Sequence, residues 1–416
     1  MKKLLLFFGL LCIPNLKAQG LRALYNESKT AYETQDWDSF KNLNLKMLGI
    51  HPSHPTILYN AGIAYGKKGQ QDSLMHYINK VLSWNAELDL ADADLKAIDT
   101  DSTLTPQLSA LKEKYNMKIE HGQDLIKVKG GYHFEDLVRI GDDFYLTDVL
   151  NKAVIKANTN SSDTALVKRF SLSPLSLVAD DDQKTVWISL AAVLHSSQYA
   201  MEHQYKSYLV NMDIKTGQAL SQITLPDSSI VGSLQLVNNK IYATSSKNPE
   251  VYVVDIKKGV LEQTHQIEEG FNLQGIAYDP ETERVFVADY IKGIFYAPIS
   301  NLEDRTWVNT PNYLLKGLDG LQVIDSKTLV ASQNNSRPKR ILRIHLDAKG
   351  DNATVELLEN NIESSGEPTN LHIDSAGDVF YIPNSAWTMY SEDLKPEKPH
   401  PGDQTVRRIR LSDVKK

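Results

Sequence analysis

Polar side chains stand at the start of several runs in which apolar and polar residues alternate. The clearest run is "GLDGLQVIDSKTLVASQ" at residues 317–333, where Asp319 directly precedes the alternation. Comparable positions open five other runs: Glu135, Ser173, Ser233, Gln274 and Thr369. If the fold gathers these positions, two carboxylates and several neutral oxygens would suit a hard divalent cation. Such a cation can support hydrolysis by polarising a carbonyl and lowering the pKa of a bound water.

The runs belong to a unit that recurs along the chain, two strands joined by a polar turn. Copies begin at residues 134, 174, 232, 272, 317 and 367, most of them followed by a third strand and some by a fourth. Units of about 40 to 58 residues indicate a six-bladed β-propeller, in which each sheet is covered by its neighbours. The first strands of the blades would line a central channel and bring the polar positions to one mouth. A β-sandwich or two stacked sheets is the alternative.

The sixth unit supplies only three strands and ends in "TVRRIRL" at residues 405–411. An additional strand, "DLIKVK" at 124–129, precedes the first unit. We expect these two strands to pair, because the pairing would complete the last blade and close the ring. The propeller would then extend over residues 124–416.

Residues 19–115 have the three- and four-residue apolar spacing of helices, so the fold class is multidomain α+β. Within them "AYETQDWDSFKNLNLKML" matches "AYGKKGQQDSLMHYINKVL" at an interval of 34 residues, which aligns Trp37 with Gln71. This resembles the tetratricopeptide repeat (TPR), whose period is 34. We expect a TPR-like domain over 19–115 and a linker over 116–123. A plain helical bundle is the alternative.

The first eighteen residues are expected to be a signal peptide. Lys2 and Lys3 precede a short apolar stretch from Leu4 to Ile13, and a small residue, Ala18, stands at the expected cleavage position. The mature protein would be soluble and exported, periplasmic or secreted. Cleavage of the signal peptide would also remove Cys12, the only cysteine, so any metal in the mature protein would be bound by oxygen or imidazole.

Composition narrows the classes of partner. The net charge is −7, and it becomes −10 when the three lysines of residues 1–18 are removed with no acids. An acidic chain without a basic run interleaved with aromatics is a poor nucleic-acid binder. No later stretch is apolar for long enough to span a membrane. We therefore expect a small-molecule substrate, or a protein or peptide bound by the helical repeats.

Three motifs resemble the senescence-marker-protein/gluconolactonase/luciferin-regenerating superfamily of six-bladed propellers. They are "HFEDLV" in the first unit, "NLQGIAYDPETERVFVAD" in the fourth and "GLDGLQV" in the fifth, and their order agrees with that family. The resemblance covers roughly residues 125–411. It departs from the family pattern in the third unit, where "VGSLQLVNN" replaces an Asn-Asp-Gly element.

The resemblance implies a ligand set for one divalent cation: calcium, manganese or zinc. In the family a glutamate, an asparagine and an aspartate hold the metal, and Glu135 and Asp319 match by type. Gln274 stands where the family has asparagine. The implied activity is hydrolysis of a sugar lactone or a related small ester, with Asp319 as ligand or general base. The alternative is a polar, water-filled channel mouth without catalysis.

Two long insertions separate the second and third strands of a unit. One, at 189–208, carries Tyr199 and His203, and the other, at 383–404, carries Trp387 and Tyr390. Loops between these strands lie at the same mouth as the polar positions. The four side chains are therefore expected to shape the substrate site as a lid or wall.

Other candidates receive structural interpretations. His133 and His372 lie beside strand starts and are expected to be packed or hydrogen-bonded. Asp148 and Asp289 end second strands and are expected to accept hydrogen bonds from turn amides. No Gly-x-Ser-x-Gly motif surrounds any serine.

Two functions remain open. The first is a metal-assisted hydrolase of sugar lactones with helical repeats as an appendage. The second is a non-catalytic scaffold in which the repeats and the propeller both bind ligands or proteins. Propellers host both classes, so the residues at the channel mouth must decide.

Overall fold

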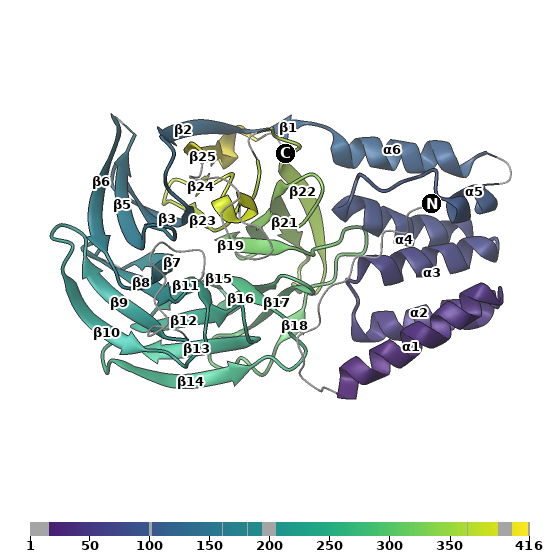
Figure 1. The fold of residues 1–416 in the computed structure, drawn as a ribbon, viewed down its shortest axis with the longest axis horizontal. Coiled ribbons are helices and arrows are strands. Elements are labelled where there is room, and N and C mark those ends of the chain that lie inside the picture. Colours follow the sequence, from purple (N-terminus) through teal and green to yellow (C-terminus); the bar gives the residue numbers. More distant parts are fainter. Residues whose placement is uncertain are drawn as a thin grey trace. The chain divides into compact units, whose positions relative to one another are not determined.

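The computed structural model describes residues 16–99, 102–159, 161–180, 182–193, 205–363, 365–389 and 402–414. The chain divides into two compact units, one of residues 1–81 and 89–108 and the other of residues 82–88 and 109–416. The first unit is helical and the second is a propeller (Figure 1). None of the described helices is long and apolar enough to cross a membrane.

The helical region confirms the expected helices. They are α1 (Leu16–Glu33), α2 (Trp37–Ile50), α3 (Pro55–Lys67), α4 (Gln71–Trp84), α5 (Ala93–Ile98) and α6 (Leu104–Asn116). α1 packs on α2, and α2 packs on α3. The Asp36 side chain caps α2 by accepting a hydrogen bond from the Ser39 amide. Gly66 lets α3 pass close to Ile98, since a Cβ there would lie 2.7 Å from the Ile98 Cδ1.

The propeller contains six sheets, which confirms the predicted six blades. Blade 1 is β3 (Phe134–Ile140), β4 (Asp143–Asp148), β5 (Ala153–Asn158) and β6 (Ser161–Arg169); blade 2 is β7 (Ser173–Ala179), β8 (Thr185–Ala191), β9 (Ser207–Asp213) and β10 (Ala219–Thr224). Blade 3 is β11 (Val231–Val237), β12 (Lys240–Ser245), β13 (Glu250–Asp255) and β14 (Val260–Gln266); blade 4 is β15 (Leu273–Asp279), β16 (Arg284–Asp289), β17 (Gly293–Pro298) and β18 (Thr306–Trp307).

Blades 5 and 6 each include a strand from before residue 130. Blade 5 is β19 (Leu318–Asp325), β20 (Thr328–Gln333), β21 (Arg340–Leu346) and β22 (Ala353–Asn360), with β1 (Ile119–Glu120) paired to β22; blade 6 is β23 (Leu371–Ile373), β24 (Asp378–Tyr381), β25 (Gln404–Arg410) and β2 (Gly122–Val128). The first strands contact one another in the order β3, β7, β11, β15, β19, β23 and back to β3. This closed order places the start of every first strand around one axis.

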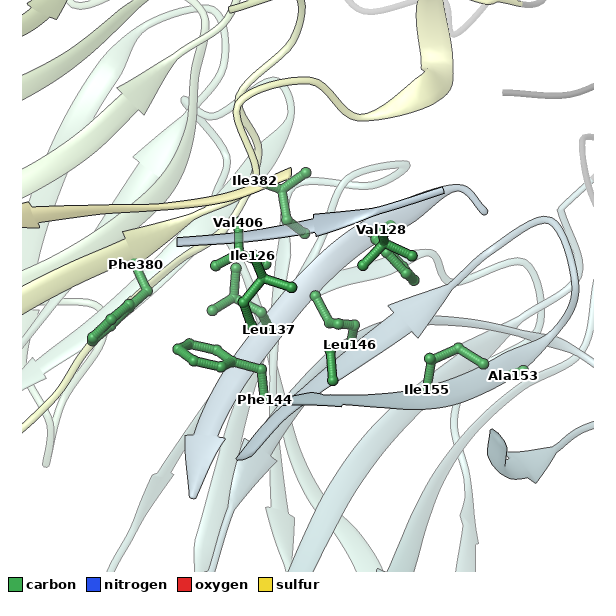
Figure 2. Close-up of a cluster of buried hydrophobic side chains, with 12 residues drawn as sticks. Ile126, Val128, Leu137, Phe144, Leu146, Ala153, Ile155, Phe380, Ile382 and Val406 are labelled. Atoms are coloured by element: carbon green, nitrogen blue, oxygen red, sulfur yellow. The ribbon is translucent and has the colours of Figure 1, made fainter. Parts of the chain in front are cut away.

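Strand β2 joins the beginning of the propeller to its end. It pairs antiparallel with β25, with Ile126 opposite Val406 and Lys127 opposite Thr405. Apolar side chains of β2, β24 and β25 point toward those of β3, β4 and β5 (Figure 2), and they form one buried cluster in which the rings of Phe144 and Phe380 pack edge to face. The seam between blades 6 and 1 is therefore closed by both backbone pairing and apolar packing.

A β-bulge interrupts the pairing of the first two strands in each of blades 1 to 5. In blade 1, for example, Phe134 pairs with Asp148 and the next pair is Leu137 with Leu146. A bulge turns the intervening side chains away from the ladder. Neighbouring blades approach closely at this level, since a Cβ on Gly320 would lie 2.6 Å from the Thr369 carbonyl oxygen.

A hydroxyl at the fifth residue of the second strand links a blade to the next one. The four residues of this kind are Thr147, Ser189, Thr244 and Ser332. Ser332 Oγ, for example, accepts from the Gly320 amide at 2.7 Å and donates to the Thr369 carbonyl at 2.6 Å. Ser189 Oγ likewise donates to the Val231 carbonyl at 2.8 Å. These bonds fix the bulge residues that carry the polar side chains.

Candidate functional site

The strand register identifies the side chains that occupy equivalent bulge positions. They are Glu135, Leu175, Gly232, Gln274 and Asp319 in blades 1 to 5. In blade 6, which has no bulge between its described first two strands, Thr369 takes the corresponding place, two residues before the first paired residue of β23, Leu371. The expected positions Ser173 and Ser233 are wrong by two residues and one residue. The alternation shows that a strand begins there, but the pairing partner that sets the bulge is not visible in it. We call the four polar members of this set and the side chains around them the channel mouth.

Glu135 and Asp319 come from blades 1 and 5 and lie close enough for their charges to interact. Burial raises the pKa of Glu135 well above its ordinary value, and the charge of Asp319 raises it further. Burial also raises the pKa of Asp319 to about 7, and the next largest cause is the charge of Glu367. The fold therefore brings together the two acids singled out in the sequence and adds a third from blade 6.

Blade 6 supplies the hydrogen bonds that hold Glu135. Ser385 Oγ and Trp387 Nε1 both donate to Glu135 Oε2, at 2.8 and 2.6 Å. Thr369 Oγ1 donates to the Glu135 backbone carbonyl at 2.7 Å. His133 Nε2 lies 3.0 Å from Ser385 Oγ, and its ring meets the Trp387 ring edge to face at 4.5 Å between centroids.

Asp319 is held by residues of its own blade and of blade 4. Asn334 Nδ2 donates to Asp319 Oδ2 at 2.6 Å, and Tyr290 donates its hydroxyl hydrogen to Asn334 Oδ1 at 2.8 Å. Burial raises the pKa of Tyr290, as do the charges of Asp319 and Glu367. This row of hydrogen bonds fixes Oδ2 of Asp319, while Oδ1 accepts no hydrogen bond from the described residues.

Gln274 occupies the equivalent position of blade 4 but is turned toward blade 3. Its Nε2 donates to Asn272 Oδ1 at 2.6 Å, and a Cβ on Gly232 would lie 3.2 Å from its Oε1. In the described part of the chain no hydrogen bond joins it to Glu135 or Asp319. Of the three ligands implied by the resemblance, the structure thus brings the two carboxylates together.

The layer beneath the mouth is narrow and polar. Asn370 Nδ2 of blade 6 donates to the Gly232 carbonyl of blade 3 at 2.8 Å, which crosses the axis between opposite blades. Asp136 is buried and accepts hydrogen bonds from Ser176 Oγ at 2.6 Å and from the Leu177 amide at 3.0 Å. Burial raises the pKa of Asp136 to about 7, while these donors oppose the rise. Asp136 therefore ties blade 1 to blade 2.

Two further aspartates have the structural role expected for them. Asp148 Oδ1 accepts from the amides of His133 and Asn151. Asp289 accepts from four backbone amides: Phe271, Asn272, Ile291 and Lys292. Both side chains are fully buried, and each shapes the turn that precedes a first strand. His372 is also packed, against Phe380, and burial lowers its pKa to about 4.

Of the four residues expected to shape the site, Trp387 is described and contacts Glu135 directly. Tyr199, His203 and Tyr390 lie outside the described residues. Trp387 belongs to a short 3-10 helix, Ala386–Met389, at the start of the blade 6 insertion. One side chain of that insertion therefore forms part of the channel mouth.

Sequence reasoning missed Glu367, Asn334 and Ser385. Asn334 directly follows the second strand of blade 5, as Ser385 closely follows that of blade 6, so a polar residue after a second strand was an available signal. Glu367 stands two residues before Thr369, in "GEPTN". Its role depends on contacts between blades, which strand alternation does not report.

The donor set at the channel mouth consists of oxygen atoms, which fits a hard cation such as Ca²⁺ better than Zn²⁺. The described residues contain no group of three or more His, Cys, Asp or Glu side chains arranged to hold a metal ion. A cation would therefore depend on the carboxylates of Glu135 and Asp319, with neutral oxygens and water completing its coordination. Such a cation would offset the electrostatic repulsion between the carboxylates of Glu135 and Asp319.

No family model matches the chain, and no curated protein matches it in sequence. Similar solved structures include a gluconolactonase from Xanthomonas campestris, with 12% identity, a TM-score of 0.48, and coverage of 70% of this chain and 93% of that one. Luciferin-regenerating enzyme has 9% identity and a TM-score of 0.45, covering 69% and 94%. PQQ-bound aldose sugar dehydrogenase from Streptomyces coelicolor has 10% identity and a TM-score of 0.48, covering 69% and 97%.

The propeller is established by the six sheets of this chain itself. What the chain does has to be inferred from its own residues.

Proposed function

We propose that the channel mouth is the active site of a hydrolase for sugar lactones or related small esters, dependent on a divalent cation. The observation that carries the proposal is the convergence of Glu135 and Asp319, two largely covered carboxylates whose pKa values are raised by burial and, for Glu135, also by the charge of Asp319. Burying two acids together is unfavourable unless a proton or a cation compensates. Perturbed acids in a channel mouth are also typical of functional sites.

Glu135 and Asp319 would hold the cation, which when bound would polarise the ester carbonyl. As a general base, Asp319 would accept a proton from the attacking water, and burial, which raises its pKa to about 7 in the protein without a cation, makes its carboxylate more basic than an exposed one. Asn334 keeps the Oδ2 atom of Asp319 engaged, so Oδ1 is the atom that would bind the cation or, where Asp319 acts as the general base, accept the proton. Trp387 lies beside Glu135 and supplies an apolar wall for the substrate.

The test begins with the metal content of purified protein and with thermal shifts in Ca²⁺, Mn²⁺ and Zn²⁺, followed by assays on a panel of lactones. Asp319→Ala is expected to lose the thermal shift and the activity together. Asp325→Ala is the matched control, because Asp325 is an exposed aspartate on the same strand. If wild type and Asp319→Ala behave alike in all three measurements, the hydrolase proposal fails.

A scaffold is the second candidate, and a specific observation favours it. Trp387 and Ser385 occupy one oxygen of Glu135, and Asn370 crosses the axis below, so part of the mouth is filled by the protein itself. The starts of α2 and α4, at Trp37 and Gln71, are 34 residues apart, which is the TPR period and suits a peptide-binding repeat. Absence of lactone hydrolysis and of metal in the wild type would support this function.

We also propose that the chain is exported and loses residues 1–18. The support is the order of Lys2, Lys3, the apolar stretch and Ala18 in the sequence. Mass spectrometry of protein recovered from the periplasm or medium is expected to find Gln19 at the N-terminus. Recovery of the full-length chain from the cytoplasm alone would contradict export.

A further inference from the structure

A row of hydrogen bonds leads from His133 to Glu135 through a serine 250 residues away from Glu135 in sequence. His133 Nε2 is 3.0 Å from Ser385 Oγ, and Ser385 Oγ is 2.8 Å from Glu135 Oε2. His133 and Ser385 are fully buried, whereas the side chain of Glu135 keeps 13% of its exposure. The row therefore runs from the interior of the protein toward the accessible channel mouth.

The direction of these bonds follows from the number of hydrogens available. Trp387 Nε1 can only donate, so Glu135 Oε2 is an acceptor in that bond. Ser385 has one hydroxyl hydrogen, which it donates to the same oxygen. Ser385 must then accept from His133, and this requires a hydrogen on His133 Nε2.

The two donors leave the carboxylate of Glu135 with unequal oxygens. Oε2 accepts from both Ser385 and Trp387, while Oε1 accepts no hydrogen bond from the described residues. The backbone of Glu135 is fixed as well, because Thr369 Oγ1 donates to its carbonyl. The backbone of Ser385 is fixed in turn, because its amide donates to the Glu367 carbonyl at 2.9 Å. Glu135 is thus held from blade 6 through both its backbone and one carboxylate oxygen.

We propose that Ser385, oriented by His133 and assisted by Trp387, is a positioning residue that fixes Glu135 through Oε2 and presents Oε1 to a hard divalent cation. The choice of cation as the ligand rests on the proposed function, whereas the positioning rests on the hydrogen bonds alone. Hydrogen bonds behind a ligating carboxylate commonly change metal affinity by about 10- to 100-fold when they are removed.

The first test reads the tautomer of His133 and needs no bound ligand. Protein labelled with ¹⁵N-histidine is examined by NMR, and His133 is identified as the residue whose signals move in Trp387→Phe, because the indole ring lies 4.5 Å from the imidazole. We expect a hydrogen on Nε2 in the wild type. A His133 that carries its hydrogen only on Nδ1 would overturn the proposed direction and with it the role of Ser385.

The second test measures Ca²⁺ affinity by calorimetry in the full chain. Ser385→Ala and Trp387→Phe are each expected to weaken Ca²⁺ binding about tenfold or more, and Ser385→Thr, which keeps the hydroxyl, is expected to restore most of it. Ser176→Ala is the matched control, since Ser176 is also a buried serine that donates to a buried carboxylate, that of Asp136. It is expected to change stability and to leave Ca²⁺ affinity within about twofold.

The outcomes separate this inference from the proposed function. If the wild type binds Ca²⁺ and both Ser385→Ala and Trp387→Phe bind it equally well, positioning is wrong while the hydrolase stands. If the wild type binds no Ca²⁺, Mn²⁺ or Zn²⁺, the cation proposal fails, and the His133 tautomer alone decides whether the row of hydrogen bonds orients Glu135. Should Ser385→Ala fail to fold, Trp387→Phe provides the same comparison from the second donor.

Discussion

Among single residues, the acids of the channel mouth have the most unfavourable surroundings, because burial and neighbouring negative charge both disfavour their ionised forms. Glu135, Asp319 and Glu367 come from three blades, and the negative charge of one raises the pKa of another. Their few hydrogen-bond donors, such as Asn334 and Ser385, only partly offset burial. Placing three acids this close together costs stability. Such a costly arrangement is typical of a functional site.

The first prediction concerns stability and pH at Asp319. Because its pKa is raised to about 7, the folded protein holds this proton more tightly than the unfolded chain does. The resulting stability is complete below about pH 4 and is lost as pH rises toward 7. Asp319→Asn has no carboxylate to ionise and therefore does not lose this stability. At pH 8 and without divalent cations we expect the variant to be more stable than wild type by about 1 kcal/mol or more, which corresponds to a Tm increase of about 2–4 °C.

Thermal unfolding across pH 4 to 8 in the presence of a chelator checks this prediction. The difference between Asp319→Asn and wild type should grow with pH and be small at pH 4. Asp325→Asn serves as the control because Asp325 lies exposed on the same strand. A constant difference at every pH would show that Asp319 is already ionised in the acidic range.

At the scale of strands, the bulge and the hydroxyl that supports it form the device that aims the polar side chains. Ser332 is fully buried and serves both the Gly320 amide and the Thr369 carbonyl. Asp319 precedes Gly320, and Thr369 in turn supports Glu135. The orientation of both acids therefore depends on one hydroxyl between blades 5 and 6.

We predict that Ser332→Ala destabilises the protein by about 1–3 kcal/mol, because it leaves a buried donor and a buried acceptor unsatisfied. Urea unfolding measures the change. Ser375→Ala, at an exposed turn position of blade 6, should stay within about 0.5 kcal/mol of wild type. A near-neutral Ser332→Ala would mean that water replaces the hydroxyl and that the blades are not locked at this point.

The sequence predicted the strands better than it predicted their register. Alternation located all six units, because each second strand is buried and regular, as in Asp143–Asp148 and Thr328–Gln333. It misplaced the inward residues of blades 2 and 3, where Leu175 and Gly232 occupy the bulge. A bulge inserts one unpaired residue at the start of the strand, and which residue this is can be read only from the pairing with the second strand.

The candidate site was predictable only in part for the same reason. Glu135 and Asp319 could be found because each opens a strand in a recognisable motif. The contact of Trp387 with Glu135 joins residues 252 positions apart and depends on how the insertion folds back. Periodicity carries no information about such a contact.

At the scale of the whole propeller, the seam between blades 6 and 1 holds together both the ring and the site. Arg407 on β25 is buried and reaches the start of β2 through Asp124 Oδ1 and the Gly122 carbonyl, at 2.8 and 2.7 Å. It also donates to Glu359 of blade 5 at 3.1 Å. A single guanidinium thus joins the closing strand to two blades.

The corresponding prediction is that Arg407→Met lowers the free energy of unfolding by about 3–5 kcal/mol, because it leaves the buried carboxylate of Glu359 without its positively charged partner. Arg408→Met is the control on the same strand. Arg408 only approaches Asp378, at 3.8 Å and with partial exposure, so its loss should cost about 0–1 kcal/mol. Equal effects of the two substitutions in urea unfolding would argue against a special role for Arg407.

The last prediction separates the closure of the ring from its general stability. Ile126 on β2 and Ile223 on β10 are both outer-strand isoleucines with 4% exposure, in the clusters of blades 6–1 and 2–3 respectively. Each substitution to alanine should lower the free energy of unfolding by about 2–5 kcal/mol. Only Ile126→Ala should speed hydrogen exchange in β2, β25 and β3, since it loosens the cluster that contains Phe134, directly before Glu135. If Ile223→Ala loosens the same strands to the same extent, the ring opens as one unit, and the position of Glu135 does not depend on closure in particular.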